Sequence, residues 1–102
     1  MNDCLFCKIA AGEIPSTKVY EDETTLAFRD INPQAPVHVL VIPKKHVSGW
    51  YDAQNESDAE LAHLMRVAAM VAKSENIVES GFRVVSNCGD DAQQTVKHLH
   101  LH

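Results

Sequence analysis

The sequence lacks any apolar run of the roughly 20 residues that a helix needs to cross a bilayer. The first residues, MNDCLFCK, contain neither the basic region nor the apolar stretch of a secretory signal peptide. Positive charge is also scarce, because 9 lysines and arginines face 14 acidic residues and leave a net charge of −5. We therefore expect no membrane insertion and no general attraction to nucleic acid or to anionic lipid.

Cysteine is scarce as well, and its number is odd. Three cysteines in 102 residues exclude a disulfide-stapled scaffold and, without an export signal, indicate a reducing cytoplasm. Hydrophobic residues make up 45% and charged residues 23% of the chain, which is typical of a globular protein. With no internal repeat or linker in the sequence, we expect a single cytoplasmic domain over residues 1–102.

The order of the expected elements favours a small α+β protein. A short helix over 4–11 is closed by Gly12, and a long helix over 57–76 carries the one extended helical pattern. The apolar stripe of this long helix consists of Leu61, Leu64, Met65, Ala68, Val71 and Ala72. Strands are expected over 18–22, 25–30, 37–42, 82–87 and 96–102. Because strands and helices do not alternate regularly, the five-stranded sheet should be mainly antiparallel.

The last expected strand contains the most informative pattern of the sequence. His98, His100 and His102 alternate with Leu99 and Leu101, so the three imidazoles share one face of the strand and the leucines the other. Neighbouring imidazoles on that face start about 6.6 Å apart. Such a row can attack and hold a phosphorus centre, or it can bind a metal. A purification tag does not fit, because the intervening leucines are typical of a strand that packs on a core.

Several motifs accompany the histidines. They are FCKI at 6–9 with EIP at 13–15, LAFRDINP at 26–33, APVHVLVIPKKH at 35–46 and QTVKHLHLH at 94–102. On these motifs the sequence resembles the histidine triad (HIT) family, in particular its nucleotide-binding Hint branch, over essentially the whole chain. The resemblance implies the HIT-like fold and a homodimeric purine nucleoside phosphoramidate hydrolase. Such an enzyme cleaves a P–N or related adenylyl bond and releases a nucleoside monophosphate.

The resemblance also implies catalytic roles. His100 would attack the α-phosphorus and form a nucleotidyl-histidine intermediate. His102 would bind the phosphate oxygens or pass a proton to the leaving amine, and His38 would support His100. An imidazole suits this chemistry because its ordinary pKa of about 6.5 leaves it neutral for much of the time at pH 7. From the residues alone, an ordinary half-exposed strand residue is an equally good interpretation of His38.

Nucleotide contacts follow from the same resemblance. Asp30 would accept hydrogen bonds from both ribose hydroxyls, and Asn87 and Thr95 would donate hydrogen bonds to phosphate. The side chains that would sandwich the base are Phe6, Ile9, Phe28, Ile31 and Leu40. Ordinary turn formation by Asp30 and simple core packing of the apolar set remain the alternatives.

A second constellation is the pair Cys4 and Cys7. A Cys-x₂-Cys pair is a common half of a tetrahedral zinc site and needs two further nitrogen or sulfur ligands. The resemblance implies that His46 and His98 complete a structural zinc site with no vacant position. Thiol redox chemistry is the lesser alternative, because no β-α-β pattern of the thioredoxin kind is visible.

Two other functions remain open at this level. A catalytic zinc held by the triad would make the protein a metal hydrolase, and a nucleotide-binding interaction module would have only weak activity. The sequence also departs from the family pattern, with Gln93 where a glycine is usual, and with His102 as its last residue where the family continues. A side chain at position 93 would hinder close approach of the backbone to a phosphate. The residues that follow the triad in the family shape the dimer and the leaving-group side, so the effect on dimerisation and specificity stays open. Cys88 is expected to be an ordinary thiol, and His63 receives no role.

Overall fold

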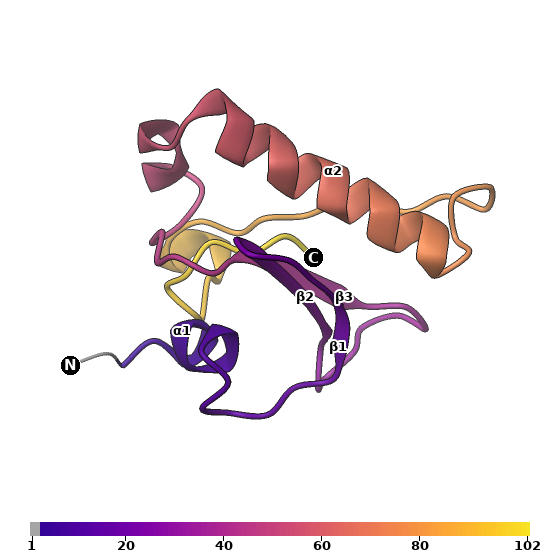
Figure 1. The fold of residues 1–102 in the computed structure, drawn as a ribbon, viewed down its shortest axis with the longest axis horizontal. Helices are drawn as coiled ribbons and strands as arrows, with labels where there is room; N and C mark the ends of the chain where they lie inside the picture. The colour runs from indigo at the N-terminus through magenta and orange to yellow at the C-terminus, as the bar shows by residue number, and fades with distance from the viewer. Residues whose placement is uncertain (1–2) are drawn as a thin grey trace.

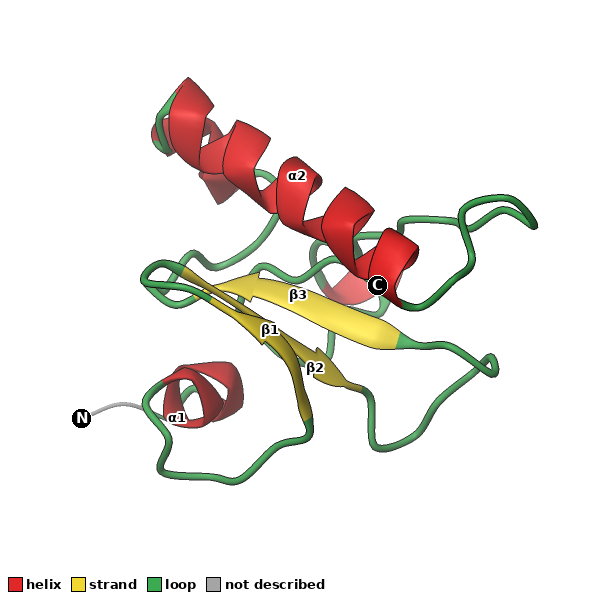
Figure 2. Cartoon of the chain, turned by 45° about the vertical axis from the view of Figure 1, so that its right-hand side comes forward, coloured by secondary structure: helices red, strands yellow, loops and turns green. Residues whose placement is uncertain are grey.

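The computed structural model describes residues 3–102 and places two helices on opposite faces of an antiparallel sheet (Figures 1 and 2). The sheet has the order β1-β2-β3. The elements are α1 (Leu5–Ala10), β1 (Lys18–Glu21), β2 (Thr25–Arg29), β3 (Val39–Pro43) and α2 (Asp58–Ser74). Two short 3-10 turns, η1 (Asp52–Asn55) and η2 (Asp90–Ala92), interrupt the loops. The expected α+β class and antiparallel sheet are thus confirmed.

Local chemistry explains where the helices begin and end. At the start of α2, the hydroxyl of Ser57 accepts the backbone N–H of Glu60, and the Glu60 carboxylate accepts the backbone N–H of Ser57. The helix stops at Ser74, two residues earlier than expected, because Asn76 adopts a left-handed conformation (φ 65°) beyond the C-cap. Cys4 caps α1 in the same way, since its sulfur accepts the backbone N–H of Cys7 at 3.2 Å.

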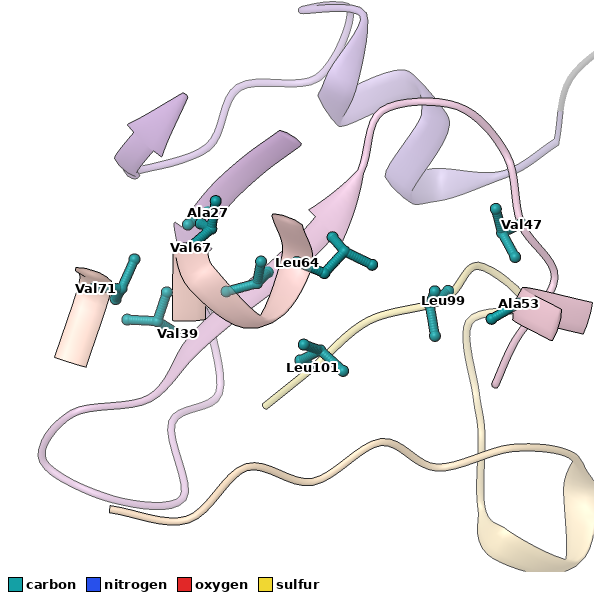
Figure 3. Close-up of a cluster of buried hydrophobic side chains, with 10 residues drawn as sticks. Ala27, Val39, Val47, Ala53, Leu64, Val67, Val71, Leu99 and Leu101 are labelled. Carbon is teal, nitrogen blue, oxygen red and sulfur yellow. The ribbon is translucent and has the colours of Figure 1, made fainter. Parts of the chain in front are cut away.

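Alternation along the strands divides the core into two clusters. Residues 25–29 of β2 pair with 39–43 of β3 in uninterrupted register. Ala27, Val39 and Val41 therefore face α2 and pack with Leu64, Val67 and Val71 (Figure 3). The other cluster lies on the α1 side and consists of Phe6, Ile9, Leu26, Phe28, Leu40 and Ile42. β3 is thus buried on both faces, which explains its unbroken apolar sequence.

The expectation of five strands is wrong, because residues 3–102 form three. Between the segments 82–87 and 96–102, the pairing is limited to Val85 and His102, which exchange hydrogen bonds of 3.0 and 2.7 Å. On its other side the backbone of the histidine segment pairs with β3 at one position, between Leu101 and Val41, with hydrogen bonds of 2.9 and 3.0 Å. A regular strand needs several successive ladder bonds, and Leu99 instead donates to Val47, outside β3. The two segments are therefore extended and aligned without forming full strands.

The stripe expected on α2 is also partly wrong. Met65 is 73% exposed, whereas Val67 is fully buried. The buried positions Leu64, Val67 and Val71 follow i, i+3, i+7 spacing, and Met65 lies about 100° around the helix from Leu64. Among residues 3–102, no helix combines the length and apolar character needed to cross a membrane.

Candidate functional site

The histidine segment presents its two kinds of side chain to opposite sides, as its alternation predicts. Leu99 and Leu101 are buried in the cluster beneath α2. His98 and His100 are 0% and 5% exposed on the other side, and His102 is half-buried. The rings of His100 and His102 lie 4.9 Å apart in an edge-on arrangement. The leucines therefore anchor the segment to the core while its imidazoles assemble into a site.

The proton of His100 is fixed by a backbone carbonyl. Nδ1 of His100 lies 2.6 Å from the carbonyl oxygen of His98. A carbonyl can only accept, so Nδ1 carries the proton and donates it. A neutral imidazole with a proton on Nδ1 keeps the lone pair of Nε2 available. His100 thus has one nitrogen suited to attack an electrophile.

A chain of hydrogen bonds also determines the tautomers of His38 and His102. The backbone N–H of Gln34 donates to Nδ1 of His38 at 3.0 Å, so the proton of His38 resides on Nε2. His38 Nε2 lies 2.9 Å from Nδ1 of His102. Nδ1 of His102 therefore accepts the hydrogen bond that His38 Nε2 donates. The remaining nitrogen of His102, Nε2, therefore carries a hydrogen that it can donate to a ligand.

Burial favours the neutral form of His102. Desolvation lowers the pKa of His102, and the neighbouring imidazoles His100 and His38 lower it further, while Asp30 acts in the opposite direction. Asp30 itself is positioned by a turn in which its Oδ1 accepts the backbone N–H of Asn32 at 2.8 Å. Its Oδ2 lies 3.4 Å from Nε2 of His38. Of the residues expected to be catalytic, His38 thus contacts His102, and His102 lies beside His100.

The four expected metal ligands converge. The ligand atoms of Cys4, Cys7, His46 and His98 all lie within 4.8 Å of one another. Nδ1 of His98 is 3.2 Å from the sulfur of Cys4 and 3.4 Å from that of Cys7, and Nδ1 of His46 is 3.3 Å from Cys7. A tetrahedral zinc ion separates a thiolate sulfur and an imidazole nitrogen by about 3.5 Å. The donor set and its spacing therefore fit zinc.

The surroundings of His98 strengthen this fit. Its Nε2 donates to the carbonyl oxygen of Pro43 at 2.8 Å, which leaves the lone pair of Nδ1 directed at the two thiols. Burial lowers the pKa of His98, although the Pro43 carbonyl partly opposes this effect. A neutral imidazole held in this tautomer by a second-layer carbonyl is the form that binds zinc.

A second convergent group is less suited to a metal. Asp30, His38 and His102 also bring their ligand atoms within 4.8 Å of one another. However, Nδ1 of His38 accepts the N–H of Gln34, so its Nε2 must keep the proton that a metal would displace. Within residues 3–102, no convergent group contains two of the three triad histidines. This geometry disfavours the alternative of a catalytic zinc held by the triad.

The side chains expected to sandwich a base divide into two environments. Phe6, Ile9, Phe28 and Leu40 are buried together on the α1 side of the sheet, with Phe6 and Phe28 edge to face at 5.5 Å. Ile31 is 91% exposed on the turn after β2 and does not join them. The structure therefore brings four of the five together and leaves Ile31 apart.

The loop before the triad is held by Gln94, which the sequence does not single out as a functional residue. This buried amide accepts the N–H of Gly89 at 2.8 Å and donates to the carbonyl oxygens of Ser48 and Val96 at 2.8 and 3.1 Å. Gly49 packs against it so closely that a Cβ there would lie 3.1 Å from its Oε1. The signal for its role is only its place within the motif at 94–102.

The expected phosphate ligands lie on the same loop or next to it. The amide of Asn87 donates to the carbonyl of Ala92 at 2.8 Å, and Thr95 is exposed. Gln93 adopts a left-handed conformation with φ 63°. Glycine adopts this conformation without steric cost, which explains the glycine of the family pattern at this position. The Gln93 side chain is exposed.

A groove of about 610 Å³ opens beside the histidines. Its lining includes the polar side chains of His38, Asn87 and His102. It also includes apolar residues of the last turns of α2 and of the extended segment 82–85, whose Phe82 and Val84 are about half exposed. A ligand that contacts His102 can therefore extend along an apolar wall.

Two residues without a predicted function also acquire a setting. His63 on α2 donates to the carboxylate of Asp22 at 2.7 Å, and Tyr20 donates to the same carboxylate at 2.8 Å. Hydrogen bonding by Tyr20, Thr24, His63 and Thr25 lowers the pKa of Asp22, against the opposing effect of its burial. The network ties α2 to the β1–β2 turn. Cys88 is an exposed free thiol, as expected.

Comparison with known proteins identifies several similar chains. The model of the HIT domain matches residues 11–102. A 14 kDa zinc-binding protein of Zea mays is 51% identical over 100 residues, which cover 96% of this chain and 77% of the relative. A HIT family hydrolase from Clostridium thermocellum has a TM-score of 0.92 and 50% identity, with 100% of this chain and 89% of that chain covered. A histidine triad nucleotide-binding protein from Candida albicans has a TM-score of 0.89 and 39% identity, covering 98% and 72%.

Proposed function

Because this chain belongs to the HIT domain family, we propose that it is a purine nucleoside phosphoramidate hydrolase of the cytoplasm, working as one domain over residues 1–102. The observation that carries the proposal is the 2.6 Å hydrogen bond from Nδ1 of His100 to the carbonyl of His98. It leaves Nε2 of His100 as an oriented, unprotonated nucleophile. The hydrolase and nucleotide-binding relatives support the same class of chemistry.

The proposed reaction has two steps. Nε2 of His100 attacks the α-phosphorus, a new P–N bond forms to the imidazole, and the P–N bond to the leaving amine breaks. His102 donates its Nε2 hydrogen, the one left exposed by the His38 contact, to a phosphate oxygen, and the departing nitrogen takes up a proton from water. A second water then attacks the phosphorus, breaks the P–N bond to His100, releases the nucleoside monophosphate and gives its proton to the solvent.

The nucleotide is proposed to bind through one carboxylate, two neutral hydrogen-bond donors and a set of apolar side chains. Asp30 would accept the ribose hydroxyls with Oδ2, since its Oδ1 is engaged by Asn32. Asn87 and Thr95 would donate to the phosphate. The apolar residues Phe6, Ile9, Phe28 and Leu40 would contact the base, with Ile31 closing over it from its exposed position. This last contact requires movement of the turn after β2, because Ile31 packs with none of the other four.

We also propose that the four-residue centre holds one zinc ion per protomer, through Cys4, Cys7, His46 and His98. The convergence of these ligand atoms and the zinc-binding relative support it. Four protein ligands leave no open coordination position, so such an ion would fix α1 to the sheet rather than activate water.

A homodimer is proposed for the active form. Its support is the exposed apolar surface of Phe82 and Val84 on an extended segment that lines the groove next to His102. An obligate homodimer interface is expected to bury such surface. Sedimentation of the protein at micromolar concentration should give the mass of two chains, and Phe82→Asp should give one.

The decisive experiment measures turnover of an adenosine phosphoramidate with an aminoalkyl leaving group. His100→Gly should abolish amine release while AMP still binds, because the nucleotide contacts lie on other residues. More than about a tenth of normal turnover in this variant would refute the nucleophile, since general-acid help alone contributes about 10²–10⁴-fold. Tight AMP binding by the unaltered protein with no turnover would instead favour an interaction module.

A further inference from the structure

The candidate metal centre and the candidate nucleophile share His98. Its side chain places Nδ1 beside the sulfurs of Cys4 and Cys7, at 3.2 and 3.4 Å. Its backbone carbonyl accepts the proton of His100 Nδ1 at 2.6 Å. A displacement of the His98 side chain thus moves the group that sets the tautomer and the orientation of His100.

Phe6 forms a second connection between the two sites. It lies on α1 between the two cysteines, and its ring meets that of His100 edge to face at 5.0 Å. Phe6 also contacts Phe28, with ring centroids 5.5 Å apart, and is 5% exposed. The Phe6 ring is therefore held in the core and packs directly against the imidazole of His100. A helix of six residues has little stability of its own, and its position depends on its anchors.

We propose that the centre formed by Cys4, Cys7, His46 and His98 positions the nucleophile His100, in addition to holding α1 on the sheet. This inference rests on the proposed function. Occupancy of the centre fixes the His98 carbonyl from one side and the Phe6 ring from the other. A purely structural zinc would lower turnover only as far as the folded fraction falls. The positioning role lowers the turnover of protein that is still folded.

Matched variants separate the two roles. Cys7→Ser removes a ligand, whereas Val67→Ala weakens the fully buried core under α2 without touching either site. Cys88→Ser changes an exposed thiol and serves as the second control. At a temperature where all variants are folded, Cys7→Ser should lower kcat per folded molecule by about 10–100-fold, because small misplacements of reacting groups have effects of this size. Val67→Ala and Cys88→Ser should stay within about twofold of the unaltered protein.

A conservative variant tests whether the metal itself is responsible. Cys7→Asp replaces the thiolate by a carboxylate, which can also bind zinc, so excess zinc should restore its kcat, whereas Cys7→Ser should recover less. Metal content and folded fraction are measured on the same samples. Equal loss of kcat in Cys7→Ser and Val67→Ala at matched folded fractions would overturn the proposal.

A spectroscopic arm does not depend on turnover. The proton of His100 Nδ1 should give a protected, downfield NMR signal in zinc-loaded protein at fixed pH, because it is held in a buried hydrogen bond. Chelation under folding conditions should broaden or remove the signal, and added zinc should restore it. A signal indifferent to zinc would refute the coupling even if the enzyme is active. A zinc-dependent signal in protein without any turnover would retain the coupling and refute the proposed reaction.

Discussion

Replacement of His38 tests how the histidines cooperate. In the structure His38 donates to Nδ1 of His102 at 2.9 Å and accepts the N–H of Gln34 at 3.0 Å. Its direct effect is therefore on the orientation and tautomer of His102. A neutral hydrogen bond contributes about 0.5–1.5 kcal/mol. This energy changes the ratio of correctly oriented to misoriented His102 imidazoles by about two- to thirteen-fold. His38→Ala should lower kcat by this factor.

His38→Gln supplies the matched comparison. A glutamine can accept the Gln34 N–H with its amide oxygen and donate to His102 with its amide nitrogen, as the neutral imidazole does. It should restore kcat to within about threefold of the unaltered protein, because both hydrogen bonds are regained. The assay follows amine release from the phosphoramidate under saturating substrate, with AMP affinity as the control for intact binding.

The size of the loss decides between two roles for His38. If His38 were a proton acceptor essential for His100, both variants would lose about 10²–10⁴-fold, because glutamine cannot take up a proton. That result would refute the view that His38 acts by orienting His102. An unchanged kcat in His38→Ala would also refute this view, because it would show that the orientation of His102 does not depend on His38.

Three further outcomes are expected. Asp30→Ala should weaken AMP binding about 10–150-fold but 2′-deoxy-AMP binding much less, because a charged hydrogen bond to hydroxyls contributes about 1.5–3 kcal/mol. Gln93→Gly should stabilise the protein by about 0.5–1 kcal/mol in urea unfolding, because it relieves the left-handed conformation at φ 63°. Burial lowers the pKa of His102, so the unfolded chain binds more protons there. Stability should be constant above about pH 6.5 and decrease below it, and less so in His102→Gln.

Each of these outcomes has a clear contrary. Equal loss of affinity for AMP and its 2′-deoxy analogue would remove the ribose role of Asp30. A destabilised Gln93→Gly protein would mean that the glutamine side chain makes a contact worth more than the backbone strain. Parallel melting curves of the two proteins between pH 8 and pH 5 would show that His102 does not contribute to acid unfolding.

The sequence predicts the elements whose signals are local. The long helix is predicted by its apolar spacing and by a serine at its start, and β2 and β3 by short runs of apolar and β-branched residues. The histidine face follows from a period of two, because side chains of any extended segment alternate. Whether such a segment completes a strand depends on which partners reach it, and this is why 82–87 and 96–102 differ from expectation.

The candidate site shows the same division. Residue types with distinctive chemistry, such as the two cysteines, can be recognised in the sequence, and the cysteines do converge with His46 and His98 in the structure. The backbone groups that set their tautomers cannot be recognised, since the carbonyls of Pro43 and His98 have no side-chain signature. Gln94 is similar, because its three partners are backbone groups, one of them on the distant residue Ser48. The exposure of Ile31 reflects the path of a turn with two prolines nearby.

The alternation of histidine and leucine in the last segment makes it intolerant of changes in length. Leu99 and Leu101 fill the core while the imidazoles line the site one residue out of phase. Insertion or deletion of one residue before His98 would turn the remaining segment over, placing imidazoles in the dry core and leucines at the phosphate. Point substitutions here damage one function at a time, but a shift of a single position would destroy packing and chemistry together. Relatives should therefore differ in this stretch by substitution and not by length.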